Sequence, residues 1–188
     1  GKLSRGLGDV YKRQIVGAPA LVDLDLDGEK EIIFTTQYGS SGSLYAITHD
    51  GTDIVGFPVN INEKMIAGPA VGDLDNDGSP DIVIVTWSDN IYAINNIGNV
   101  KEGFPVLSTE RFSIAPILVD LDFDGDLEII VGNDSGLLQI FEHTGAEVTS
   151  YDVGEDIRGG LSLSDLDNNG SLEVLFTGYD DLIHVWSP

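Results

Sequence analysis

The chain has 188 residues, 41% of them hydrophobic, with 32 acidic and 9 basic side chains and a formal net charge of −23. This length is enough for one domain with a substantial buried core. The negative charge argues against a nucleic-acid partner, because phosphates would be repelled. The sequence has no cysteine, which excludes disulfides and thiol chemistry. It also has no apolar run near the ~18 residues of a membrane span, so we expect no membrane insertion.

Residues 1–14 do not share the pattern of the rest of the chain, and they lack the apolar central region of a signal peptide. We expect them to be a processed or foreign end, with the chain a fragment of a longer protein. The remaining residues, 15–188, are built from repeats.

A nine-residue pattern occurs four times, with oxygen-bearing side chains at positions one, three, five and nine and glycine at position six. We name the four copies loops 1 to 4, which are residues 23–31, 73–81, 120–128 and 165–173. Ca²⁺ takes six to eight oxygens at ~2.3–2.6 Å, and a short loop supplies them only by curling around the ion. Glycine permits the sharp turn. The pattern therefore predicts up to four Ca²⁺ sites.

The candidate metal ligands include the seventh loop residues. They are Asp23, Asp25, Asp27, Glu29, Glu31, Asp73, Asp75, Asp77, Ser79, Asp81, Asp120, Asp122, Asp124, Asp126, Glu128, Asp165, Asp167, Asn169, Ser171 and Glu173. Loop 4 has Asn169 in place of a carboxylate, so we expect it to bind Ca²⁺ less tightly than loops 1 to 3.

Two alternatives compete with this interpretation. An EF-hand needs a glutamate at position twelve and flanking helices. Position twelve is apolar in all four copies, and the residues that follow each loop are typical of buried strands. Polar hairpin turns would also be rich in Asp and Gly. Four copies in one register favour metal loops over simple turns.

The loop starts are separated by 50, 47 and 45 residues, which is the period of a propeller blade. In each unit a short apolar strand precedes the loop and a β-branched strand leaves it. A third strand follows, at 43–47, 91–94, 137–141 and 182–186. This predicts an all-β protein, a β-propeller with four-stranded antiparallel blades at about 15–62, 63–110, 111–156 and 157–188.

Three finer expectations follow from the repeat. Leucine at loop position two is expected to point into the core of every blade. The fourth strand is expected to end at a Gly-Phe-Pro-Val segment, 56–59 and 103–106, and to be plainer at 147–153. The fourth unit lacks this strand. Either Asp9–Lys12 completes that blade, or the protein has more blades and this piece is an open arc.

The residues resemble the FG-GAP and VCBS repeats, which include the calcium-bearing blades of integrin α-subunits. Gly17-Ala18-Pro19 and the four loops carry the resemblance, which covers about residues 15–187. Departures are Asn169, and Leu161 where three units have proline. The resemblance implies an extracellular or cell-surface scaffold, of bacterial type, for adhesion to glycans or matrix proteins. Extracellular sites bind Ca²⁺ with Kd of ~0.1–1 mM, which fits this location.

A partner would bind the end of the propeller opposite the loops, where aromatic rings lie beside polar groups. The chosen ligand-binding candidates are Tyr38, Trp87, Phe112, Arg158 and Tyr179. Aromatic rings can stack on sugars, but rings at strand ends often cover the edge of a core instead.

No catalytic motif is present, and metal binding accounts for most carboxylates, so no catalytic residue is assigned. His49 and His143 are expected at turns, and His184 lies in a strand without an identifiable partner. The main interpretation is a non-catalytic binding module. Two others stay open, a fragment of a larger secreted polysaccharide lyase or hydrolase and a spacer of a surface protein. The sequence does not indicate the oligomeric state.

Overall fold

The structure is a computed structural model, and it describes residues 14–188. Most of the N-terminal segment 1–14, with the candidate strand Asp9–Lys12, lies outside the described residues. Residues 14–188 form fifteen strands and no helix, which confirms the all-β prediction. Accordingly, no helix of the described part is long and apolar enough to cross a membrane.

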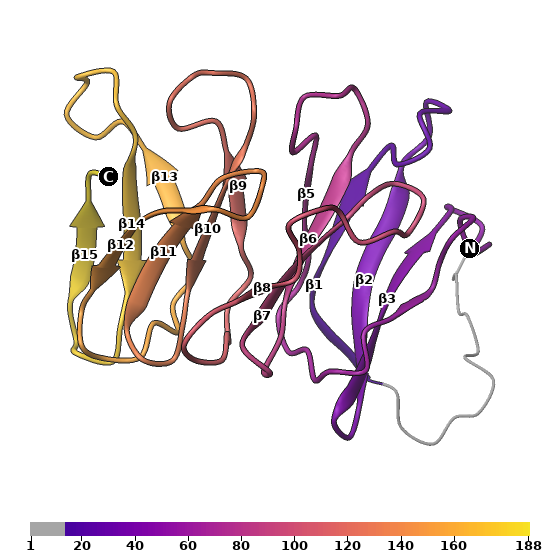
Figure 1. Ribbon diagram of the computed structural model, residues 1–188, viewed down its shortest axis with the longest axis horizontal. Coiled ribbons are helices and arrows are strands. Elements are labelled where there is room, and N and C mark those ends of the chain that lie inside the picture. Colours follow the sequence, from indigo (N-terminus) through magenta and orange to yellow (C-terminus); the bar gives the residue numbers. More distant parts are fainter. Residues whose placement is uncertain (1–13) are drawn as a thin grey trace.

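The strands form four antiparallel sheets, which we name blades 1 to 4 and which follow one another along the molecule (Figure 1). Blade 1 contains β1 (Gln14–Val22), β2 (Glu31–Tyr38), β3 (Ser41–Ile47) and β4 (Val59–Asn60). Blade 2 contains β5 (Ala70–Gly72), β6 (Asp81–Val85), β7 (Asn90–Ile94) and β8 (Val106–Leu107). Blade 3 contains β9 (Ile117–Val119), β10 (Glu128–Gly132), β11 (Leu137–Phe141) and β12 (Glu147–Asp152). Blade 4 contains β13 (Ser162–Ser164), β14 (Glu173–Thr177) and β15 (Ile183–Trp186).

The register of the first two strands places all four loops at the same end of the molecule, the top in Figure 1. In each blade the residue before the loop pairs with loop position nine, as Val22 pairs with Glu31 and Gly72 with Asp81. The loop is therefore closed at its base by strand pairing. The turns between the second and third strands lie at the opposite end.

The fourth strands differ from the prediction. β4 begins at Val59 and β8 at Val106, where the sequence analysis placed their ends. Proline has no N–H to donate to a ladder, so Pro58 and Pro105 stay outside the strands. Gly56 and Gly103 have φ of 94° and 88°, which turns the chain before the strand starts.

The core consists of three apolar clusters, each between two neighbouring blades. In blades 1 to 3, four equivalent positions face the following blade: loop position two, one residue of the second strand and two of the third. Blade 4 has the same four positions. We call these four positions the next-blade set. Its members are Leu24, Ile33, Leu44 and Ala46 in blade 1, Leu74, Val83, Ile91 and Ala93 in blade 2, Leu121, Ile130, Leu138 and Ile140 in blade 3, and Leu166, Leu175, Ile183 and Val185 in blade 4.

The expectation that loop position two is always in the core is wrong for blade 4. Leu24 and Leu74 are fully buried and Leu121 is half-buried, but Leu166 is 50% exposed. Within residues 14–188, no blade follows blade 4, so nothing there covers this position. The lack of a following blade within these residues also leaves Ile183 and Val185 exposed.

Candidate metal centres

The four loops share one backbone conformation. The residue at position four has a positive φ, between 51° and 63°, in Leu26, Asn76, Phe123 and Asn168. The glycine at position six also has a positive φ, from 91° to 103°. The carboxylate at position nine accepts the N–H of the position-two leucine, at 2.7, 3.3, 2.6 and 2.8 Å in loops 1 to 4. These contacts join the last side chain of each loop to the backbone at its start.

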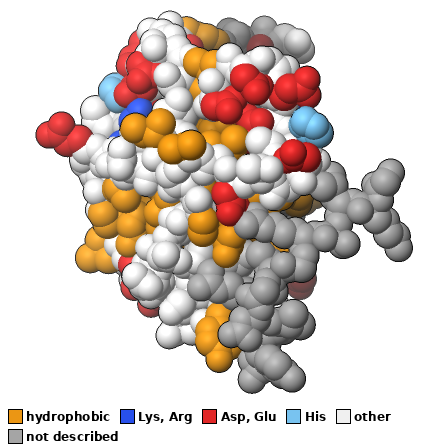
Figure 2. Space-filling model, turned by 90° about the vertical axis from the view of Figure 1, so that its right-hand side faces the viewer, with side chains coloured by type: hydrophobic (Ala, Val, Ile, Leu, Met, Phe, Trp, Pro, Cys, Tyr) orange, Lys and Arg blue, Asp and Glu red, His pale blue; other side chains and the backbone are white. Residues whose placement is uncertain are grey.

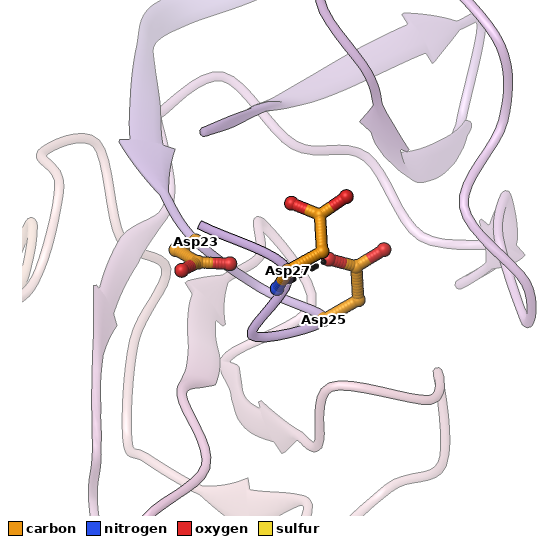
Figure 3. A group of neighbouring side chains, drawn as sticks. All are labelled: Asp23, Asp25 and Asp27. Carbon is orange, nitrogen blue, oxygen red and sulfur yellow. Dashed lines mark hydrogen bonds between the residues drawn. The ribbon is translucent and has the colours of Figure 1, made fainter. Parts of the chain in front are cut away.

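Three carboxylates converge in each loop, with one oxygen of each within 4.8 Å of the other two. In loops 1 and 2 they are at positions one, three and five; Figure 3 shows Asp23, Asp25 and Asp27, with the Asp27 N–H bonded to Asp25 at 3.3 Å. In loops 3 and 4 they are at positions one, three and nine. Carboxylate oxygens gathered in this way are the ligands that Ca²⁺ prefers.

Loop 3 has a further feature that points to a cation. Asp120 Oδ1 and Glu128 Oε1 are buried and have no hydrogen-bond partner among the described residues. Both residues belong to the converging group of this loop, whose third member is Asp122. Buried carboxylate oxygens are normally satisfied, so two unpaired ones in one group fit a site built for a metal ion.

The electrostatics of loop 3 agree with this. Burial raises the pKa of the Glu128 carboxyl above its usual value, and the charges of Asp122 and Asp124 act in the same direction, against the hydrogen bond from Leu121. A bound divalent cation would offset both the burial and the repulsion. Asp120, Asp122 and Glu128 are the side chains that would hold Ca²⁺ in this loop.

Some sequence-predicted ligands lie outside the converging groups. Position nine is outside the group in loops 1 and 2, and Asp124 at position five is outside it in loop 3, so none of loops 1 to 3 brings its four carboxylates together within 4.8 Å. The carboxylates at position seven, Glu29 and Asp126, are also outside the groups. The N–H of each position-seven residue instead donates to the side chain of position five, at 2.7–2.9 Å.

Loop 2 contains a contact that the sequence analysis missed. Lys101 Nζ lies 2.8 Å from Asp75 Oδ2 and 2.6 Å from Asp81 Oδ2. Burial opposes the charge on this lysine, but its hydrogen bonds to Asp75 and Asp81 prevail and raise the pKa of Lys101 above its ordinary value. Lys101 follows loop 2 by twenty residues, so spacing within the loop gives no sign of it.

At the opposite end, two of the predicted ligand-binding residues have intramolecular partners. Lys64 Nζ lies 3.1 Å from the centre of the Trp87 ring, and the Arg111 guanidinium carbon is 5.1 Å from it. Arg158 Nη2 donates to Asp134 at 2.9 Å and to Asp156 at 3.0 Å. The Trp87 ring and the Arg158 guanidinium therefore already serve internal contacts.

The expectation for Phe112 is wrong, because its side chain is 1% exposed and belongs to the core between blades 2 and 3. Its backbone forms an isolated antiparallel bridge with Asn133 of blade 3. Tyr38 and Tyr179 are exposed, at 54% and 68%. Of the five candidates, these two tyrosines offer an accessible ring, although Arg158 lies 5.5 Å from the Tyr179 ring.

Tyr38 borders a small polar pocket of about 180 Å³ at the end of blade 1 opposite loop 1. The pocket is lined by Thr36, Tyr38, Ser41, Gly42, Ser43, Asn60 and Asn62. It contains hydroxyl and amide groups but no charged side chain. Asn60 and Asn62 were not predicted, because no motif marks them: Asn60 lies in β4 and Asn62 follows it.

Two of the three histidines lie close to a carboxylate. His143 Nδ1 lies 3.4 Å from Asp126 Oδ2, beside loop 3. His184 Nε2 lies 2.7 Å from Asp180 Oδ2, and its ring stacks on Phe176. The His184 pair lies at the end of the molecule opposite the loops and is part-buried. Figure 2 shows the blade 1 side of the molecule, where acidic side chains gather towards the loop end.

The comparisons with solved structures show the same fold. BamB from Moraxella catarrhalis aligns with a TM-score of 0.65 and 17% identity, over 92% of this chain and 46% of that one. BBS1N, in complex with ARL6DN, aligns with a TM-score of 0.62 and 16% identity, over 94% and 49%. The designed protein Ika4 aligns with a TM-score of 0.64 and 10% identity, over 95% and 94%. The β-propeller prediction is confirmed. The chain spans about half the length of the BamB and BBS1N chains.

No curated protein matches the chain. A family model described as FG-GAP-like repeat matches twice, at residues 23–84 and 73–131. The two matches begin at the first residues of loops 1 and 2 and each runs past the following loop, so loops 1 to 3 are part of what is matched. Together they span more than half of the chain, and the chain therefore belongs to the FG-GAP-like repeat family.

Proposed function

We propose that this chain is a calcium-stabilised, non-catalytic scaffold of an extracellular or cell-surface protein. The observation that carries the proposal is loop 3, where Asp120 Oδ1 and Glu128 Oε1 are buried without a described partner inside a group of three converging carboxylates. Ca²⁺ bound there would balance the repulsion between these groups. Sites of this kind on extracellular modules bind with Kd of ~0.1–1 mM, which suits the calcium concentration outside cells.

Thermal unfolding with excess Ca²⁺, with excess Mg²⁺ and with a chelator tests this proposal. An ion that binds the folded state stabilises it by about 2.7 kcal/mol per site at a hundredfold excess over Kd. Mg²⁺ demands tighter octahedral geometry and gives up water reluctantly, so we expect a smaller effect from it. No difference between calcium and chelator would contradict the proposal.

Two variants make the test specific to loop 3. Glu128→Gln removes one charge from the converging group and is expected to reduce the gain in Tm that calcium produces. Glu155→Gln is the matched control, because Glu155 is exposed and outside the loops. Equal calcium gains in the two variants would show that the stabilising ions bind elsewhere.

A second part of the proposal concerns the partner. The polar pocket beside Tyr38 combines an exposed ring with hydroxyl and amide groups and no charge, which is the chemistry that binds a neutral sugar. We propose that this pocket, rather than the region around Trp87, contacts a glycan. A glycan array with the wild type should find a ligand that Tyr38→Ala loses and Tyr179→Ala keeps. Glycan binding that is indifferent to Tyr38→Ala would remove the pocket from the proposal.

A further inference from the structure

The ammonium group of Lys101 lies against two of the predicted metal ligands of loop 2. It contacts Asp75 at loop position three and Asp81 at position nine, at 2.8 and 2.6 Å. The Asp81 side chain is 3% exposed and that of Lys101 is 15% exposed. Such short contacts between a cation and two carboxylates are strong, charge-assisted hydrogen bonds. They use one oxygen of each of two predicted metal ligands.

The position of Lys101 is fixed by the blade itself. Its backbone N–H donates to the Ala93 carbonyl of β7 at 2.9 Å, and its carbonyl accepts the Phe104 N–H at 3.2 Å. The lysine stem therefore starts from a rigid point beside loop 2. Bringing its ammonium to the two carboxylates requires ordering of the side chain alone.

The equivalent positions of the first and third repeats carry no charge. In blade 1 the residue is Ile54, whose N–H donates to Ala46 at 3.0 Å as that of Lys101 does to Ala93, and whose side chain is buried in the core. In blade 3 the residue is Val148, two positions into β12. Loop 2 thus has a cation supplied by its own chain, and loops 1 and 3 have none from this position.

We propose that Lys101 is a tethered cation that replaces Ca²⁺ in loop 2, so that this loop keeps its conformation without calcium while loops 1, 3 and 4 require it. The inference rests on the proposed calcium binding of the other loops. It also changes the order of calcium affinities expected from the sequence, in which loop 2 was among the loops that bind calcium most tightly. The ammonium and a divalent ion repel each other, and both would use Asp75, which belongs to the converging group of loop 2.

Isothermal titration calorimetry with CaCl₂ tests the proposal on three proteins: the wild type, Lys101→Met and Lys64→Met. Methionine keeps much of the aliphatic stem and removes the charge. Lys64→Met changes the net charge equally but at the opposite end of the molecule. We expect Lys101→Met to bind one more calcium ion than the wild type, and Lys64→Met to match the wild type. Equal stoichiometry and affinity in all three proteins would overturn the proposal.

Thermal unfolding in chelator provides a readout without metal. Lys101→Met removes the cation from two clustered carboxylates and is expected to melt roughly 4–8 °C below Lys64→Met in chelator. Excess calcium should remove this difference in Tm. Lys101→Arg retains a cation, so its Tm in chelator should be close to that of Lys64→Met. A gap that calcium does not reduce would mean that Lys101 is only a structural ion pair. If neither the wild type nor Lys101→Met binds calcium, the proposed function fails as well, which the titration distinguishes from failure of the Lys101 proposal alone.

Discussion

Blades 2 and 4 carry the same apolar pattern in different surroundings. The next-blade set of blade 2, Leu74, Val83, Ile91 and Ala93, is fully buried against blade 3. In blade 4 the equivalent Ile183 is 75% exposed, although it is as hydrophobic as Ile91. The contribution of these positions to stability therefore depends on the neighbouring blade. A sheet with two apolar faces is stabilised fully only when both are covered.

The largest expected effect separates Leu74 from Leu166. Leu74→Ala removes a fully buried side chain and should lower the free energy of unfolding by about 3 kcal/mol. Leu166→Ala should change it by less than about 0.5 kcal/mol, because this leucine is half exposed. Urea unfolding of the two variants in excess calcium measures both values. Similar losses in the two variants would mean that blade 4 has a covered face in solution.

A second contrast concerns calcium. Asp73 Oδ2 and Asp165 Oδ2 accept the glycine N–H of their loops at 2.9 and 3.0 Å, so Asp→Asn is the same perturbation in both. Asp165→Asn should reduce the stabilisation that calcium gives by up to about 2.7 kcal/mol at a hundredfold excess over Kd. Asp73→Asn should leave the stabilisation by calcium unchanged, because in our proposal the Lys101 ammonium replaces calcium in loop 2. The Tm with calcium minus the Tm with chelator is the measurement. A loss in Asp73→Asn as large as in Asp165→Asn would contradict the role given to Lys101.

The sequence predicts the parts of the structure that depend on short spacing. Position nine of each loop pairs with the residue before the loop, so one nine-residue pattern determines both the turn and the strand register. Contacts between distant residues were not predictable. Lys101 reaches loop 2 from beyond β7, and Phe112 enters the core where an exposed ring was expected. The prediction for Leu166 was wrong for a different reason. Its place in the repeat is the same as that of Leu74, but no blade follows blade 4 within the described residues.

The smallest expected effect concerns a feature that blades 2 and 4 share. Both have asparagine at loop position four, Asn76 and Asn168, where φ is 51° and 59°. Blade 3 has Phe123 there, with a φ of 63° and an exposed ring. Asparagine tolerates this left-handed conformation better than a bulky residue does. Since little packing is lost, Phe123→Asn should raise the free energy of unfolding by up to about 1 kcal/mol.

The reverse exchange, Asn168→Phe, should lower the free energy of unfolding by a similar amount, since its surroundings are equally exposed. Thermal unfolding of both variants in chelator isolates the backbone from metal binding. If Phe123→Asn were destabilising, the ring would be contributing a contact that outweighs the backbone preference. If Phe123→Asn raises the free energy of unfolding and Asn168→Phe lowers it, the nine-residue pattern determines the loop conformation. The residue at position four then changes only the stability of that conformation.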